Sequence, residues 1–177
     1  MVFLLAIFGI ILLMLLLSAF IKKRTTLIIV TVSIIFGTIF LVDQMKYTTF
    51  TELYSDEIND DSILEKATLT VYERADDHFP KRKAELEIED KEIMEDLFQD
   101  FSKLELKKDE NLDDPFRIYS IRFVSTNKIK ENTYESEFVT LDLNSNYLEN
   151  YEIVSDTDHL KTIGSLVENE ELDWKYY

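Results

Sequence analysis

Cysteine is absent from this 177-residue chain, and glycine is almost as scarce, with three residues in all. Without cysteine the chain has no disulfide, no thiolate nucleophile, no lipoprotein anchor and no Cys-ligated zinc. Gly164 is the one glycine after Val42, which excludes glycine-rich phosphate loops, the dinucleotide fingerprint and the Gly-x-Ser-x-Gly elbow from that part. The familiar signatures of nucleotide-binding proteins and serine hydrolases are therefore missing.

Charge is missing from two long stretches at the amino-terminal end. Residues 1–21 carry no ionisable side chain, and after the basic link Lys22-Lys23-Arg24 the chain is again uncharged as far as Val42. A hydrocarbon core about 30 Å thick needs roughly 20 apolar residues in a helix. Neither stretch has the polar face of a soluble amphipathic helix. The sequence predicts a two-helix transmembrane hairpin over residues 1–42, with spans at 1–21 and 25–42 and a cytoplasmic link at 22–24.

A cleaved signal peptide is the alternative for either stretch. The first has no basic side chain before its apolar part, and the second ends in Leu41-Val42-Asp43 without a small-residue cleavage site. The basic link at 22–24 favours a cytoplasmic position, so the amino terminus and everything after Val42 are expected outside the cell. Lys46, beyond the second span, opposes this orientation but is outnumbered three to one.

The chain after Val42 is strongly acidic. It holds all 35 acidic residues and 16 of the 19 basic ones, which gives it a net charge of −19. Such a field repels nucleic acids and anionic headgroups. The expected partners are the lipid bilayer and another membrane or extracytoplasmic protein, with no nucleic acid. An outside domain without disulfides fits a Gram-positive bacterium better than an animal cell surface.

The chain after Val42 is predicted to divide into a polar tether, residues 43–61, and an acidic extracytoplasmic domain, residues 62–177. Alternation of apolar and polar residues predicts strands, and helical spacing predicts two helices. Asp90 is the expected N-cap of the first helix, and Asp156 or Thr157 that of the second. The order ββαβββα implies an α+β fold, a mainly antiparallel sheet with helices on one face. Strands are expected at 63–72, 84–88, 117–124, 137–143 and 147–154, and helices at 90–104 and 160–167.

Two histidines that follow acidic residues are the candidate metal ligands. They occur in Asp76-Asp77-His78 and in Asp156-Thr157-Asp158-His159. Carboxylate and imidazole together suit zinc or manganese. A turn before Pro80 and a helix cap explain the same residues without a metal. The oxygen-rich stretch from Asp56 to Asp61 lacks the spacing and the glycine of an EF-hand. We therefore predict no metal site and no cofactor.

Candidate catalytic patterns are equally weak. Ser125 and Lys128 match the Ser-x-x-Lys pattern of penicillin-recognising enzymes, but the companion motifs are missing and the match lies at a strand end. Carboxylate pairs occur at every spacing in a chain this acidic, and a glycosidase pair also requires a cleft. The sequence predicts no catalytic residues, and we do not expect an enzyme.

From Ile63 onward the order of elements carries a resemblance. A leading strand and a short second strand precede Asp90-Lys91-Glu92-Ile93 at the start of a helix, and a hairpin closes the domain before a last helix. In this order the chain resembles the small extracytoplasmic domains of unknown function of low-GC Gram-positive bacteria. The resemblance covers about two-thirds of the chain, rests on no motif and implies no functional residues.

The expected function is that of a two-span membrane protein that displays an accessory or sensory module for a partner or ligand outside the cell. A patterned domain that lacks catalytic signatures and follows a membrane anchor supports this hypothesis. One alternative is a membrane-anchored immunity or inhibitor protein whose acidic face neutralises a basic toxin. A second is an enzyme without a recognisable motif, which requires a pocket with convergent polar groups.

Overall fold

The computed structural model describes residues 9, 11–12, 14–18, 21–58, 62–74, 80–110, 117–130 and 133–177. The chain forms two compact units, residues 1–45 and 46–177. In the first, helix α2 (Arg24–Gln44) is long and apolar enough to cross a membrane. No other helix in the described ranges meets that test.

The predicted membrane hairpin is thus supported for one of its two spans. Helix α2 contains the whole span predicted at 25–42, while most of the span predicted at 1–21 lies outside the described residues. The hydroxyl of Thr31 donates to the carbonyl of Leu27 (2.9 Å), and that of Thr38 donates to the carbonyl of Ile34 (2.8 Å). Bonds of this kind satisfy polar side chains within the helix, which is a condition for lying in hydrocarbon.

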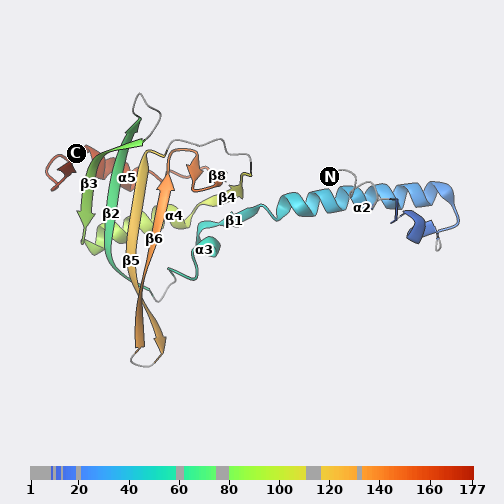
Figure 1. Ribbon diagram of the computed structural model, residues 1–177, viewed down its shortest axis with the longest axis horizontal. Helices are drawn as coiled ribbons and strands as arrows, with labels where there is room; N and C mark the ends of the chain where they lie inside the picture. Colours follow the sequence, from blue (N-terminus) through green and yellow to red (C-terminus); the bar gives the residue numbers. More distant parts are fainter. Residues whose placement is uncertain are drawn as a thin grey trace. The chain divides into compact units, whose positions relative to one another are not determined.

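The second unit is built on a nine-stranded sheet with the order β1-β4-β8-β7-β6-β5-β2-β3-β9 (Figure 1). Every neighbouring pair is antiparallel. The strands are β1 (Tyr47–Thr49), β2 (Ile63–Arg74), β3 (Pro80–Ile88), β4 (Glu105–Lys108), β5 (Tyr119–Lys130), β6 (Thr133–Leu143), β7 (Tyr147–Leu148), β8 (Tyr151–Ile153) and β9 (Lys175–Tyr176). The helices are α3 (Phe50–Leu53), α4 (Lys91–Ser102) and α5 (Lys161–Glu168). The predicted α+β class and antiparallel sheet are confirmed.

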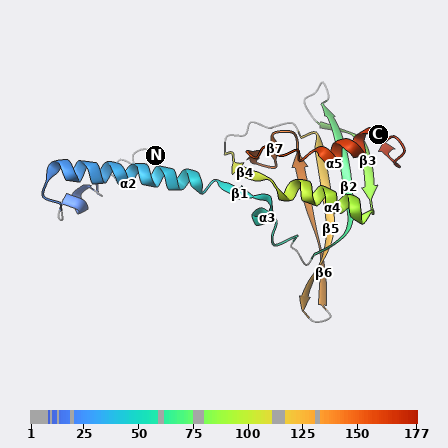
Figure 2. The ribbon, with the colours of Figure 1, turned by 180° about the vertical axis from the view of Figure 1, so that it is seen from behind.

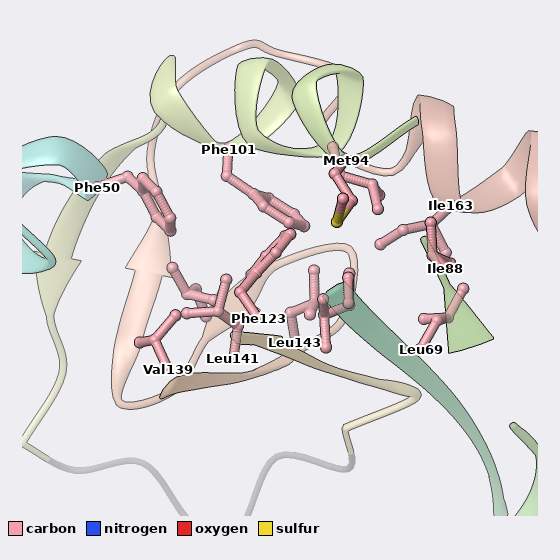
Figure 3. Close-up of a cluster of buried hydrophobic side chains, with 14 of the residues drawn as sticks. Phe50, Leu69, Ile88, Met94, Phe101, Phe123, Val139, Leu141, Leu143 and Ile163 are labelled. Carbon is pink, nitrogen blue, oxygen red and sulfur yellow. The ribbon is translucent and has the colours of Figure 1, made fainter. Parts of the chain in front are cut away.

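Helices α4 and α5 lie on one face of the sheet, which Figure 2 shows from the helix side. Alternate side chains of the long strands point to this face, because successive residues of a strand face opposite ways. Figure 3 shows the core between α4 and the sheet, where Phe101 lies between Phe50 and Phe123. The largest of the fully buried side chains are Phe50, Leu69, Met94, Leu97, Phe101, Leu104, Leu106, Ile121, Phe123, Leu141, Leu143 and Leu148.

The two larger helices are capped in different ways. Asp90 caps α4 as predicted, since its Oδ1 accepts hydrogen bonds from the backbone N–H groups of Glu92 (2.9 Å) and Ile93 (3.3 Å). The predicted cap of α5 by Asp156 or Thr157 is wrong, because α5 begins later, at Lys161. Asp100 of α4 supplies the acceptor instead, and its Oδ2 receives the N–H (3.0 Å) and the hydroxyl (2.6 Å) of Thr162. One helix therefore caps the other across the core.

Asp100→Ala is expected to lower the free energy of unfolding by about 1–2 kcal/mol, the range for loss of an N-cap acceptor. The physical reason is that the N–H and hydroxyl of Thr162 lose their shared acceptor. Urea unfolding of the full-length protein in detergent micelles measures the change. Asp96→Ala is the control because Asp96 is exposed on the same helix, and we expect it to stay within about 0.5 kcal/mol of the wild type. Equal effects of the two substitutions would contradict the assignment.

The prediction of a tether over 43–61 is wrong for most of the residues that are described there. Strand β1 pairs with β4, with Thr48 opposite Leu106. Phe50 and Ile58 are buried in the core of the sheet unit, at 1 % and 4 % exposure. Of the scattered aromatic residues here, Phe50 and Tyr54 pack on the core from a single helical turn, whereas Tyr47 on β1 is exposed. Such short elements show too few repeats to reveal a period.

The sequence also underestimated the number of strands. Strands β1, β4 and β9 contain two to four residues each and were not predicted. The strand predicted at 147–154 is divided into β7 and β8, which form a tight hairpin of their own. The break falls at Glu149, whose φ of 51° is the one positive value at a non-glycine residue in the described part of the chain. A left-handed residue cannot continue a strand, so the chain turns back on itself there.

Candidate functional site

The sheet face opposite the helices is not covered by any described element (Figure 1), and the side chains of the central strands that line it are mostly polar. Outward-facing side chains of the central strands border a hollow of about 280 Å³. Thr70 of β2 lies on this face but is only 7 % exposed, because neighbouring side chains around the hollow shield it. The volume is close to the lower limit of small-molecule sites. The hollow is lined by Thr68, Thr70, Tyr72, Arg82, Glu85, Ser120, Arg122 and Thr140.

Three charged residues and the last tyrosine form a cluster at one side of this hollow, where β9 pairs with β3. The guanidinium of Arg82 donates to the carboxylate of Glu85 (3.0 Å) and to the hydroxyl of Tyr177 (3.3 Å), and Lys175 lies 4.9 Å from the Tyr177 ring. Hydrogen bonds to Tyr177 raise the pKa of both Arg82 and Lys175, and the two cations lower the pKa of Tyr177. These contacts link β9 to β3, but charge pairs at an exposed position contribute little to stability.

Two exposed aromatic residues stand on the same face of β6. Tyr134 is 59 % exposed and Phe138 is 62 % exposed. The guanidinium of Arg122, on β5, lies 4.3 Å from the centre of the Phe138 ring. Thr140 continues this row along β6 toward the hollow. Aromatic residues and arginine are enriched at the centres of protein interfaces.

Beside these residues, β6 has an edge that the described strands leave largely unpaired, its free edge. Its other side pairs with β5 from Thr133 to Leu143, whereas β7 pairs with it only at Leu143. One residue further, Asp142 bonds with Glu149 instead of with a strand: the Asp142 N–H donates to Glu149 Oε1 (2.9 Å), and the Asp142 carbonyl accepts from the Glu149 N–H (2.8 Å). From Tyr134 to Thr140, no strand among the described residues pairs with this side of β6.

Glu149 is the strained residue that closes this edge. Its left-handed backbone costs on the order of 1 kcal/mol for a residue other than glycine, and three hydrogen bonds hold it there. The third bond runs from Nη2 of Arg117 to the Glu149 carbonyl (2.5 Å). Burial raises the pKa of the Glu149 carboxyl, and the Asp142 N–H acts in the opposite direction. Burial, followed by the charges of Glu149 and Tyr151, raises the pKa of the Tyr54 phenol well above its ordinary range.

Glu149→Gln is expected to stabilise the protein at pH 7. A carboxyl with a raised pKa in the folded state favours folding in its protonated form, so its contribution is complete below its ordinary pKa of 4.5 and is lost as the pH rises through the raised value. Glutamine keeps an acceptor for the Asp142 N–H without the buried charge. Urea unfolding from pH 4 to pH 7 measures the effect. The advantage of the variant should grow across this window, and a constant difference would contradict it.

The histidines predicted as candidate ligands are not gathered into a metal site in the described residues. His159 is 5 % exposed, and its Nε2 lies 2.9 Å from the carbonyl oxygen of Asn144, while Asp156 and Asp158 are exposed to solvent. His78 lies outside the described residues, together with Asp76 and Asp77. No group of three or more histidine, aspartate or glutamate residues in the described ranges is placed to hold a metal ion.

Ser125 of the rejected Ser-x-x-Lys match belongs to a structural network. Its buried hydroxyl donates to the backbone carbonyl of Glu57 (3.0 Å), and the amide of Asn127 donates to the same oxygen (3.1 Å) and to the carboxylate of Glu137 (3.0 Å). Glu57 Oε2 is buried and has no hydrogen-bond partner within the part of the chain that is described. The network fixes two acidic residues on the helix side of the β5–β6 hairpin.

An apolar recess of about 430 Å³ lies between α4 and the start of β2. Ile58, Leu64, Met94 and Phe98 form its apolar walls, and Lys91 and Glu95 lie at its polar side. Its lining residues are separated in the chain from the free edge of β6. The recess is compatible with a small apolar ligand but has few convergent polar groups that would select one.

The chain matches no family model, no curated protein and no solved structure. The functional interpretation therefore rests on the geometry of this sheet. Sequence reasoning missed the free edge, Glu149 and the aromatic pair, although Tyr134 and Phe138 are four residues apart in an alternating segment. That spacing puts both on one face of a strand, but only the sheet order shows that the face is uncovered.

Proposed function

We propose that this chain is a two-span membrane protein that displays an accessory or sensory binding module outside the cell, and that the module binds a protein partner with the β5–β6 hairpin. The observation that carries the proposal is the exposed row of Tyr134 and Phe138, with Arg122 stacked on Phe138. Isolated apolar residues on a surface are ordinary. A pair of aromatic residues with a stacked arginine, beside an unpaired strand edge, has the composition of an interface centre.

The membrane part of the proposal is supported by α2 and by charge. Helix α2 begins at Arg24, directly after Lys22 and Lys23, and these three residues favour a cytoplasmic link between two spans. The net charge of −19 after Val42 keeps the module away from anionic headgroups. We place the protein in the cell membrane of a Gram-positive bacterium, with the sheet unit outside. No catalytic step is assigned to the module.

Crosslinking on intact cells tests the binding function. The wild-type protein should capture one dominant partner, and Phe138→Ala should reduce the capture at least about tenfold because it removes the centre of the interface. Tyr176→Ala is the matched control, since Tyr176 is an equally exposed aromatic residue (68 %) on the far strand β9. Absence of any partner, or an equal loss in the control, would overturn the proposal.

Protease treatment of the same cells tests the orientation independently. We expect the sheet unit to be digested from outside, together with a known external control protein. Survival of the sheet unit while the control is digested would reverse the orientation. Such a result would leave the fold intact but exclude an extracytoplasmic partner.

An immunity or inhibitor protein is the second candidate function. The large number of acidic residues favours this candidate, and so does the position of two of them. Glu135 and Glu137 lie two residues apart on β6, beside the free edge. An acidic surface of this kind attracts a basic toxin at long range, and the rate of association then falls steeply with salt. Association with the captured partner that is insensitive to salt would exclude this candidate.

A further inference from the structure

We infer that the free edge of β6, from Tyr134 to Thr140, binds an extended basic segment of the partner as an added β-strand. The inference rests on the proposed function and names the chemistry of the partner. Strand addition needs a row of unpaired backbone groups and side-chain contacts that select the incoming sequence. The edge of β6 offers each of these in the residues that the structure describes.

The direction of the backbone groups follows from the bonds at the end of the edge. The N–H of Asn144 donates to the carbonyl of Tyr147 (3.0 Å), and both backbone groups of Asp142 bond with Glu149, so even-numbered residues of β6 point toward the β7 side. The register with β5 is unbroken from Leu143 back to Tyr134. Because groups alternate along a strand, those of Thr140, Phe138, Ser136 and Tyr134 point the same way.

The side chains on the two faces of this edge differ in chemistry. Tyr134 and Phe138 stand on the uncovered face and offer apolar contact. Glu135 and Glu137 lie on the opposite face, where Asn127 orients the Glu137 carboxylate. Glu57 lies on that side as well, joined through its carbonyl to Ser125 and Asn127. An incoming strand that alternates basic and apolar residues therefore complements both faces at once.

A second copy of the chain fits this edge poorly. Pairing β6 with β6 of another copy would bring Glu135 and Glu137 opposite or diagonal to the same acidic residues, and like charges across a strand pair are destabilising. The chain after Val42 also carries a net charge of −19, which opposes close approach of two copies. A basic segment relieves both repulsions.

Glu149 limits how far the added strand can extend toward the carboxyl-terminal end of β6. Its N–H and carboxylate already occupy the groups of Asp142 that a longer partner strand would use. Its left-handed backbone then turns the chain away into β8. The protein itself thus occupies the outward backbone groups of Asp142, and the positions that no described strand pairs with begin at Thr140.

A short blocked peptide of alternating lysine and valine tests the inference with the full-length protein in nanodiscs. Fluorescence anisotropy should show binding, and the same peptide with N-methyl groups on its central residues should bind at least about tenfold more weakly, because it keeps the charge but loses backbone hydrogen bonds. A glutamate-valine peptide should not bind. Equal binding of the methylated and unmethylated peptides would reduce the contact to electrostatics and overturn strand addition.

Proline substitutions test the same edge from the side of the protein. Thr140→Pro and Ser136→Pro each remove an N–H that points away from β5, so the β5–β6 ladder keeps its bonds, and proline is tolerated at strand edges. Each should weaken peptide binding about tenfold, the loss expected for about one hydrogen bond and steric exclusion. Tyr176→Pro is the control, because Tyr176 lies on the opposite edge strand and the bond from Tyr177 N–H to the Lys83 carbonyl (3.1 Å) turns its own N–H outward.

Circular dichroism and urea unfolding show whether each proline variant is folded. If a variant misfolds, strand addition is judged from the binding of the methylated and unmethylated peptides to the wild-type protein. Sedimentation gives the remaining outcome. A dimer that Ser136→Pro dissociates would assign the edge to a second copy and overturn the inference. Capture of a cellular partner that is lost in Phe138→Ala but retained in Thr140→Pro would also overturn strand addition, while the proposed binding function would stand.

Discussion

Phe101→Ala is expected to lower the free energy of unfolding by about 3–5 kcal/mol, the range for removing a buried phenylalanine. Phe101 is 0 % exposed and projects from α4 into the sheet. Its ring centre lies 5.8 Å from that of Phe50 and 6.5 Å from that of Phe123. Alanine would leave a cavity shared by the helix, the sheet and α3, and all three would lose contacts. Small domains have only about 5–15 kcal/mol of stability, so the variant should be partly unfolded when warmed.

Urea unfolding of the full-length protein in detergent micelles measures this change. Trp174 is the one tryptophan of the chain and packs against the core, so its fluorescence reports on the sheet unit. Phe138→Ala is the matched control because it removes the same side chain from an exposed position, and we expect a change within about 0.5 kcal/mol. If the two substitutions cost the same, the assignment of the core is wrong.

Phe50→Ala is expected to cost about 3 kcal/mol, although Phe50 lies in a segment whose sequence reads as a tether. The side chain is 1 % exposed and contacts the rings of Tyr54 (4.9 Å), Phe98 (5.9 Å) and Phe101. It belongs to the first elements after α2, so its loss should also release β1 from β4. Hydrogen exchange at Thr48, whose strand pairing would then be lost, should become faster.

Thr51→Ala is the control for this prediction. Thr51 is exposed on α3, one residue from Phe50, so a general sensitivity of the segment would affect both variants. Phe50→Leu should recover most of the stability because leucine fills much of the same space. A true tether would tolerate Phe50→Ala as well as Thr51→Ala, and that result would return residues 46–58 to a linker.

The long strands and α4 were predictable because their patterns repeat. Residues 63–72 alternate over enough positions to identify β2, and Asp90 followed by helical spacing identifies α4. Strand β9, with two residues, has no period at all. The break at Glu149 was hidden because glutamate is common in this chain and is not a residue that normally signals a left-handed turn. The cap of α5 was equally hidden, because Asp100, which supplies it, precedes Thr162 by 62 positions in the sequence.

The sequence by itself determined the properties that depend on local pattern and composition: an apolar helix near the amino terminus, an acidic α+β unit with a mainly antiparallel sheet, and the exclusion of cysteine and glycine-loop chemistry. The tertiary structure alone decided which strands are neighbours. It therefore decided which edge of β6 the described strands leave unpaired, and that no described element covers the sheet face that carries Phe138. The physical reason is that hydrogen-bond pairing between strands is a non-local choice. Alternation assigns a residue to a face, but only the order of strands determines what, if anything, lies against it.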